Sequence, residues 1–145
     1  VIRHALDWYK DKGIGFDVVV LLQATSPLRN AQHVKEALAI WSPETDMVVS
    51  VKEADSNPYY VLFEEDKEGF LQKSKEGNFT RRQDCPEVYE YNGAVYVVNV
   101  SAVKKKGIVN FNKKRKFIMS KESSVDVDDL IDFKLAEFLM EERIK

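Results

Sequence analysis

The chain has 145 residues, the size of one domain, and 44% of them are hydrophobic, which is ordinary for a globular core. Its 22 basic and 24 acidic residues nearly balance, so no global positive field would recruit nucleic acid. The chain has no apolar stretch near the ~20 residues that span a bilayer, no signal-peptide pattern at its start, and a single cysteine, which excludes an internal disulfide. These features predict a cytoplasmic protein with no nucleic-acid or membrane partner.

The first half of the chain predicts two helices that alternate with two strands. Apolar residues recur at helical spacing over residues 2–9, and residues 16–22 form a β-branched run typical of a strand buried on both faces. Asn30 is a suitable N-cap for a second helix, and residues 46–51 give the next strand. Because the connections are short, we expect a right-handed crossover in a mostly parallel sheet.

The second half predicts a hairpin, two more strands and two more helices. Residues 59–63 and 70–73 flank a charged turn and should pair as an antiparallel hairpin, which alone is marginal and needs support, such as a second subunit. Apolar segments at 94–100 and 117–120 predict strands, and a short helix should end at Gly107. The final helix should present one apolar face, made of Ile131, Leu135, Phe138 and Leu139. The predicted fold class is α/β with an inserted hairpin.

A polar loop follows the first predicted strand. Gln23, Ser26 and Arg29 lie at the carboxyl end of that strand, where open α/β sheets bind ligands. Their amide, hydroxyl and guanidinium groups suit a polyhydroxylated, anionic small molecule. The alternative is an ordinary strand-to-helix loop, and composition alone slightly favours that alternative.

Two further pairs of polar residues also have both a binding and a structural interpretation. Arg81 and Arg82 could clamp a carboxylate or a phosphate, or they could form a solvated face. Asn92 and Tyr96 flank Gly93, which permits close backbone approach, and they could line a ligand pocket. The alternative is a bend followed by a core tyrosine whose hydroxyl is satisfied within the protein.

Paired carboxylates stand near the C-terminus of the chain. Asp126 and Asp128 are separated by one apolar residue, so in an extended segment they point to the same side. Like charges concentrated in this way favour a hard divalent cation, and a metal beside a helix N-terminus suits phosphate chemistry. The alternative is helix capping by Asp128 or Asp129, which spacing alone favours.

Four segments occur together in one order: LLQATSPLR at 21–29, RRQDCP at 81–86, YNGAVYV at 91–97 and SVDVDD at 124–129. In this combination the sequence resembles the acylneuraminate cytidylyltransferases, the CMP-sialic acid synthetases and their relatives, from about Asp17 to Glu137. The resemblance implies a Rossmann-like domain with a protruding hairpin that forms a homodimer contact. It also implies a reaction that joins CTP and a nonulosonic acid, with Mg2+, into a CMP-sugar and pyrophosphate.

The resemblance assigns a role to each candidate residue. It implies that Asp126 and Asp128 are catalytic, metal-site carboxylates, and that Gln23 contacts the sugar. The other implied substrate-binding residues are Ser26 and Arg29 in the same loop, Arg82 on anionic substrate, and Asn92 and Tyr96 in the sugar pocket. Residues 1–145 would form one partial nucleotidyltransferase domain, with the hairpin and dimerisation insertion at about 52–86.

Two departures from the family pattern qualify these expectations. Ala24 stands where the family commonly has proline, and nothing in these 145 residues matches the first strand and the basic, Gly-rich loop that cradles the CTP phosphates. We therefore expect this chain alone to be inactive on CTP. The alternatives are a related enzyme for another nonulosonic acid, of legionaminic or pseudaminic type, or a non-enzymatic sugar-acid-binding or dimerisation module.

Overall fold

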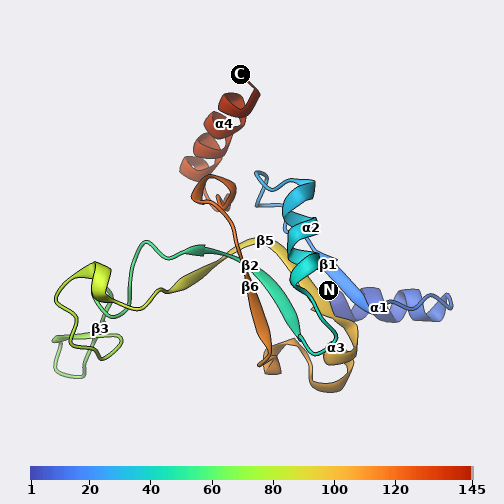
Figure 1. Cartoon of the computed structure of the whole chain (residues 1–145), viewed down its shortest axis with the longest axis horizontal. Coiled ribbons are helices and arrows are strands. Elements are labelled where there is room, and N and C mark those ends of the chain that lie inside the picture. The colour runs from blue at the N-terminus through green and yellow to red at the C-terminus, as the bar shows by residue number, and fades with distance from the viewer. Residues whose placement is uncertain (145) are drawn as a thin grey trace. The chain divides into compact units, whose positions relative to one another are not determined.

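The computed structural model describes residues 1–144, and the chain divides into two compact units. The larger unit combines residues 1–52 with the residues from 91 onward, and the smaller unit is residues 53–90. The larger unit carries a four-stranded sheet in the order β1-β5-β2-β6 (Figure 1). Its strands are β1 (Val18–Leu21), β2 (Met47–Glu53), β5 (Tyr89–Asn99) and β6 (Lys114–Ile118).

Helices and short turns connect these strands. The α-helices are α1 (Ile2–Asp11), α2 (Ala31–Ile40), α3 (Val100–Lys106) and α4 (Leu130–Ile144). Three single 3-10 turns are η1 (Arg82–Asp84), η2 (Ile108–Asn110) and η3 (Lys121–Ser123). The predicted cap of α2 is confirmed, because the Asn30 side chain accepts a hydrogen bond from the backbone N–H of His33 at 3.1 Å.

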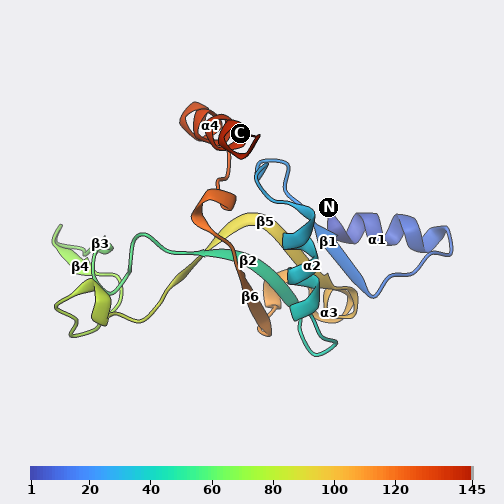
Figure 2. The same cartoon turned by 45° about the horizontal axis from the view of Figure 1, so that its top comes forward.

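The α/β class is confirmed, but the prediction of a mostly parallel sheet is wrong. Within residues 1–144, only β2 and β6 pair in parallel, with Met47 opposite Lys114, whereas β1 and β5 pair antiparallel, with Val18 opposite Asn99. β5 also runs antiparallel to β2, since the backbone N–H of Asn99 bonds to the carbonyl oxygen of Asp46, just before β2 begins. The crossover through α2 does orient β1 and β2 alike, but β5 lies between them and reverses both pairings (Figures 1 and 2).

The core of the larger unit lies where α2 covers the sheet. Ala37 of α2, Val48 of β2 and Val95 and Val97 of β5 are fully buried, and Phe117 of β6 joins them. The central strands carry apolar residues on both faces because each face is covered. Burial of each such valine contributes on the order of 1.5–3 kcal/mol.

The final helix does not bury the apolar face that periodicity predicts. Ile131 is 77% exposed and Phe138 56% exposed, and Leu135 is exposed as well, whereas Ala136 is buried. Apolar spacing identifies a face of a helix but does not say what covers it. Leu139, the fourth residue of the predicted face, is half-buried. No helix within residues 1–144 is both long and apolar enough to cross a membrane.

The smaller unit contains a two-stranded antiparallel hairpin of β3 (Phe63–Glu65) and β4 (Leu71–Lys73). The hairpin was predicted, but its first strand is shifted: β3 overlaps the predicted strand 59–63 only at Phe63 and continues into the predicted turn. Asp66 closes its turn, because its carboxylate accepts hydrogen bonds from the backbone N–H groups of Glu68 and Phe70, both at 2.9 Å. These hydrogen bonds lower the pKa of Asp66, and the bond from Phe70 has the largest effect. Burial acts in the opposite direction. Phe63, Phe70 and Leu71 stay exposed on this hairpin.

Candidate functional site

The loop after β1 is held in a fixed shape by its own residues. The Arg29 guanidinium donates to the backbone oxygens of Gln23 and Ser26, the latter at 2.6 Å. Ser26 and Leu28 are fully buried, so the loop is anchored at two points, while Gln23 remains exposed. The structure therefore places Arg29 as a brace of this loop and Gln23 at its open side.

Three polar side chains of this region converge on Gly93 of β5. A Cβ atom built on Gly93 would lie 2.5 Å from Gln23 Oε1 and 3.1 Å from both Ser26 Oγ and Asp126 Oδ2. Gly93 also has a φ of +72°, in the region that side-chain-bearing residues rarely adopt. Both the space and the backbone conformation at this position require glycine.

Hydrogen bonds join the same side chains into one cluster. Ser26 Oγ lies 3.4 Å from Asp126 Oδ1, and the Tyr96 hydroxyl donates to Gln23 Oε1 at 3.3 Å. We call Gln23, Ser26, Tyr96 and Asp126, gathered around Gly93, the Gly93 cluster. It joins the carboxyl end of β1, the middle of β5 and the segment before α4. Residues far apart in the sequence thus form one polar site.

The carboxylates near α4 divide into two kinds. Asp129 is the N-cap, since its Oδ1 accepts from the backbone N–H groups of Ile131 at 2.7 Å and Asp132 at 3.0 Å, and Asp132 bonds back to the N–H of Asp129. The predicted capping role therefore belongs to Asp129. The side chains of Asp126 and Asp128 make no capping bonds, although the backbone N–H of Asp128 also donates to Asp132 Oδ2, at 3.2 Å. Of these two residues, only Asp126 belongs to the Gly93 cluster.

The segment that carries these acids is attached to the loop after β1. The backbone N–H of Val127 donates to the backbone oxygen of Thr25 at 2.8 Å. The turn η3 lies between β6 and these acids. Arg143, on the last turn of α4, donates to the backbone oxygen of Leu28 at 2.7 Å and to Ser123 Oγ at 3.0 Å. One arginine thus ties α4 to both segments of the site.

Tyr96 is held in its neutral form by its surroundings. Burial raises the pKa of its phenol first, and the negative charge of Asp126 and the neighbouring Tyr91 raise it further. A neutral phenol can both donate and accept a hydrogen bond, so Tyr96 can bond Gln23 and still accept from a ligand hydroxyl.

The donor set suits a divalent ion that is shared with a substrate. No group of three or more Asp, Glu, His or Cys side chains in the described part of the chain is arranged to hold a metal. Mg2+ is usually bound by one or two carboxylates together with water and substrate phosphates. Asp126, half-buried, and Asp128, exposed, supply two carboxylates with no ion pair within residues 1–144. Carboxylates that are not already paired with a cation are the type of ligand that such a shared ion takes.

Two predicted site residues, Asn92 and Arg82, are not members of the Gly93 cluster. Asn92, expected to line the sugar pocket, is 2% exposed, and its side chain bonds to Ser50, Ala94 and Ser124. Arg82 lies in η1 of the smaller unit, where it is exposed. Sequence reasoning missed Ser50, Ser124 and Arg143. A serine that interrupts the apolar run of β2 was a usable signal for the first of these.

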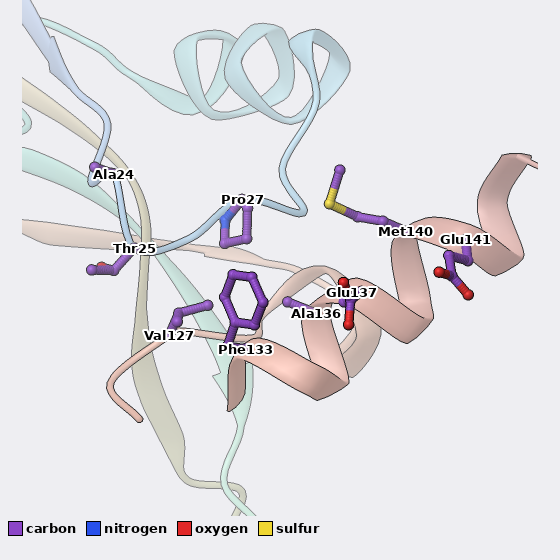
Figure 3. Close-up of a pocket in the computed structure, with 9 residues that line it drawn as sticks. All are labelled: Ala24, Thr25, Pro27, Val127, Phe133, Ala136, Glu137, Met140 and Glu141. Atoms are coloured by element: carbon purple, nitrogen blue, oxygen red, sulfur yellow. The ribbon is translucent and has the colours of Figure 1, made fainter. Parts of the chain in front are cut away.

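An apolar hollow of about 560 Å3 lies beside the site (Figure 3). Pro27 of the loop and Val127 form one side, and Phe133 and Met140 of α4 form the other. The close-up shows the Phe133 ring between Val127 and Pro27. The carboxylates of Glu137 and Glu141 stand on α4 at the edge of this space.

Several known proteins are similar in sequence to most of this chain. No protein-family model matches the chain. A Campylobacter coli protein named post-translational flagellin modification protein B is 33% identical over 129 residues, which cover 88% of this chain and 54% of that protein. An N-acylneuraminate cytidylyltransferase of Streptococcus agalactiae is 35% identical over 115 residues, 79% of this chain and 28% of the relative. A CMP-N,N'-diacetyllegionaminic acid synthase of Legionella pneumophila is 30% identical over 140 residues, which cover 92% of this chain and 58% of that protein.

These similarities place the chain among relatives whose names include nucleotidyltransferases. Within that class the chain belongs to the acylneuraminate cytidylyltransferase family, as its sequence motifs predicted. The chain spans about half the length of the Campylobacter coli and Legionella relatives, and less of the streptococcal enzyme.

A methyl group at Gly93 should disturb the site more than backbone strain alone would. Gly13 has nearly the same φ, +74°, but nothing lies within 4 Å of a Cβ built there, so Gly13→Ala is a matched control. We expect Gly13→Ala to cost about 1 kcal/mol and Gly93→Ala at least about 2 kcal/mol more, measured by urea unfolding. Equal losses in the two variants would contradict the crowding at Gly93.

The charge of Asp126 should be visible in the titration of Tyr96. In Asp126→Asn we expect the pKa of Tyr96 to fall, yet to remain above its ordinary value of 10.0, because burial persists. The pKa is measured from the tyrosine Cζ resonances by 13C NMR. Asp7→Asn, an exposed change on α1, is the control that should leave Tyr96 unaltered. A Tyr96 titration unchanged by Asp126→Asn would contradict the proximity of these two groups.

Proposed function

We propose that this chain carries the sugar-acid and metal-ion side of a cytidylyltransferase that joins CTP to a nonulosonic acid and releases pyrophosphate. The observation that supports this most directly is the convergence of Gln23, Ser26 and Asp126 on Gly93. Membership in the acylneuraminate cytidylyltransferase family supplies the reaction class. The N-acylneuraminate and legionaminic acid enzymes among its relatives supply the substrate class.

Gln23 and Tyr96 are proposed to bind the sugar acid. Gln23 is exposed at the open side of its loop, and its side-chain oxygen is bonded to the Tyr96 hydroxyl at 3.3 Å. An amide beside a neutral phenol offers donors and acceptors to the hydroxyl groups of a sugar. Such a pocket rejects analogues that lack those hydroxyls, because its own polar groups would then lose their partners. Ser26 and Arg29 are proposed to act by holding this loop in shape.

Asp126 and Asp128 are proposed to hold Mg2+, which would neutralise phosphate charge and lower the pKa of the attacking hydroxyl when bound. In the reaction, the anomeric oxygen forms a bond to the α-phosphorus of CTP as the bond to pyrophosphate breaks, and the hydroxyl proton leaves. Asp126 is the carboxylate of the Gly93 cluster and is therefore the nearest candidate to accept that proton. Asp129 is occupied by its capping bonds and is not assigned a part.

The smaller unit is proposed to supply Arg82 and a dimer contact. The guanidinium of Arg82 is exposed in η1 and could hold a carboxylate in a two-bond geometry that lysine does not offer. Three large apolar side chains, Phe63, Phe70 and Leu71, are exposed on the β3–β4 hairpin. Exposed apolar residues grouped in this way support a protein contact, and a second copy of this chain is the proposed partner.

A second candidate substrate is a legionaminic-type acid, which the name of the Legionella relative favours. Sialic, legionaminic and pseudaminic acids share the carboxylate and the anomeric hydroxyl. A binding series with these three acids would rank them for this chain.

Substitution of Gln23 tests the proposed sugar site. We expect Gln23→Ala to weaken the binding of N-acetylneuraminic acid at least about tenfold in isothermal titration with Mg2+ present, because a sugar hydroxyl loses its partner. Gln32→Ala is the matched control, since Gln32 bonds only Glu36 on the exposed surface of α2, and it should bind like the parent. If Gln23→Ala binds like the parent, the assigned site is wrong.

An activity assay on the purified chain distinguishes an enzyme from a non-enzymatic binding module. These 145 residues contain neither of the two common Gly-rich phosphate-binding motifs, the P-loop and the dinucleotide-binding G-x-G-x-x-G. We therefore propose that the chain alone binds the sugar acid but forms no CMP-sugar when CTP and Mg2+ are added. CMP-sugar formed at a steady rate by the isolated chain would contradict this part of the proposal. Sugar-acid binding that is indifferent to both CTP and Mg2+ would favour the non-enzymatic module.

A further inference from the structure

A buried polar network lies directly beneath the Gly93 cluster. Ser50 of β2 is fully buried, Asn92 of β5 is 2% exposed, and Ser124, just after η3, is 4% exposed. Apolar surroundings make each unpaired polar atom expensive, so such groups persist only when they bond to one another. The network therefore has a structural cost that a packed apolar core would avoid.

Backbone groups fix the direction of every bond in this network. The N–H of Ala94 can only donate, and it lies 3.2 Å from Asn92 Oδ1, so this end of the amide is its oxygen. The N–H of Val95 likewise donates to Ser50 Oγ at 2.7 Å, which leaves the Ser50 proton for Asn92 Oδ1 at 2.6 Å. The orientation of the Asn92 side chain is thus determined without ambiguity.

The other end of the amide reaches the segment that carries Asp126. Asn92 Nδ2 donates to Ser124 Oγ at 2.8 Å, and Ser124 donates its own proton to the backbone oxygen of Ser120 at 2.7 Å. The backbone oxygen of Asn92 also accepts from Ser26 Oγ at 3.3 Å. One residue therefore links β2, the turn at Gly93, the loop after β1 and the start of the acidic segment.

We infer that Asn92 is a positioning residue, which acts through Ser124 and Gly93 to hold Asp126 and Ser26 in place and does not itself contact the sugar acid. The inference rests on the proposed function for the identity of the ligand, but not for the network. Both heteroatoms of the Asn92 side chain have protein partners, and the residue is almost wholly enclosed. A side chain committed in this way has its effect through the groups it holds.

Ser124→Ala tests the inference without touching Asn92. This change removes the acceptor of Asn92 Nδ2 and the bond to Ser120, and it is milder than a change of Asn92 itself. Asn99→Ala is the matched control: Asn99 lies at the other end of β5, is 8% exposed, and its side chain bonds Pro43, Thr45 and Ala102. Urea unfolding gives the free energy of unfolding of each variant, so that effects of lost global stability can be subtracted.

Two measurements are made on the parent chain and both variants. The first is hydrogen exchange of the Val127 amide, which bonds Thr25 next to Asp126. The second is the affinity for N-acetylneuraminic acid in the presence of Mg2+. We expect Ser124→Ala to speed the exchange and to weaken the affinity, each by about tenfold, as for one lost hydrogen bond, and Asn99→Ala to change neither beyond its global destabilisation.

Unchanged exchange at Val127 in Ser124→Ala would overturn the positioning role. So would a Ser124→Ala variant that binds the sugar acid like the parent while Asn92→Ala loses binding, because Asn92 would then contact the ligand directly. If the parent itself binds no sugar acid, the proposed function fails, and the exchange measurement alone still supports or overturns the positioning role.

Discussion

The absence of a side chain at Gly93 is the constraint on which the rest of the site depends. Its positive φ turns the backbone of β5, and the space that a Cβ would fill is occupied by the polar ends of Gln23, Ser26 and Asp126. Ser26 and Asp126 are 100 residues apart in the sequence. They meet because β5 lies next to β1 and because the backbone of Val127 is bonded to that of Thr25.

The carboxylates near α4 do not all have the same surroundings. A helix N-terminus needs one capping side chain, and Asp129 fills that need together with Asp132. Asp126 is thereby left to face Ser26, and Asp128 to face solvent, and neither has a cation partner in the part of the chain described by the structure. The proposed metal role of Asp126 and Asp128 is therefore compatible with capping, because the cap is made by Asp129.

Local sequence rules predicted the local features of this fold. Apolar spacing and the Asn30 cap located α1, α2 and the apolar strands β1, β2 and β5, because these signals depend on neighbours within one or two turns. The more polar strands β3 and β6 are shifted from their predicted positions, 59–63 and 117–120. The order of the strands was not accessible in the same way, since the placement of β5 between β1 and β2 is a long-range pairing. The exposure of α4 was also missed, because an apolar stripe does not state what it packs against.

The candidate site divides along similar lines. Gln23 and Asp126 were found because polar residues at strand and helix ends are conspicuous, and the structure brings both to Gly93. The burial of Asn92 depends on Ser50 and Ser124, which lie 42 and 32 residues away, so sequence could not separate a pocket residue from an internal one. Arg143 was hidden for the same reason, since it reaches the loop after β1 from the far end of α4.

The most direct test of this account is to map where a nonulosonic acid binds. Amide and side-chain resonances of the 15N-labelled chain are followed by NMR as N-acetylneuraminic acid is added with Mg2+. The account predicts saturable shifts that are largest at Gly93, at the Gln23 side chain, and at Tyr96 and Asp126. Shifts confined to other parts of the chain, with these four residues unmoved at saturation, would contradict it.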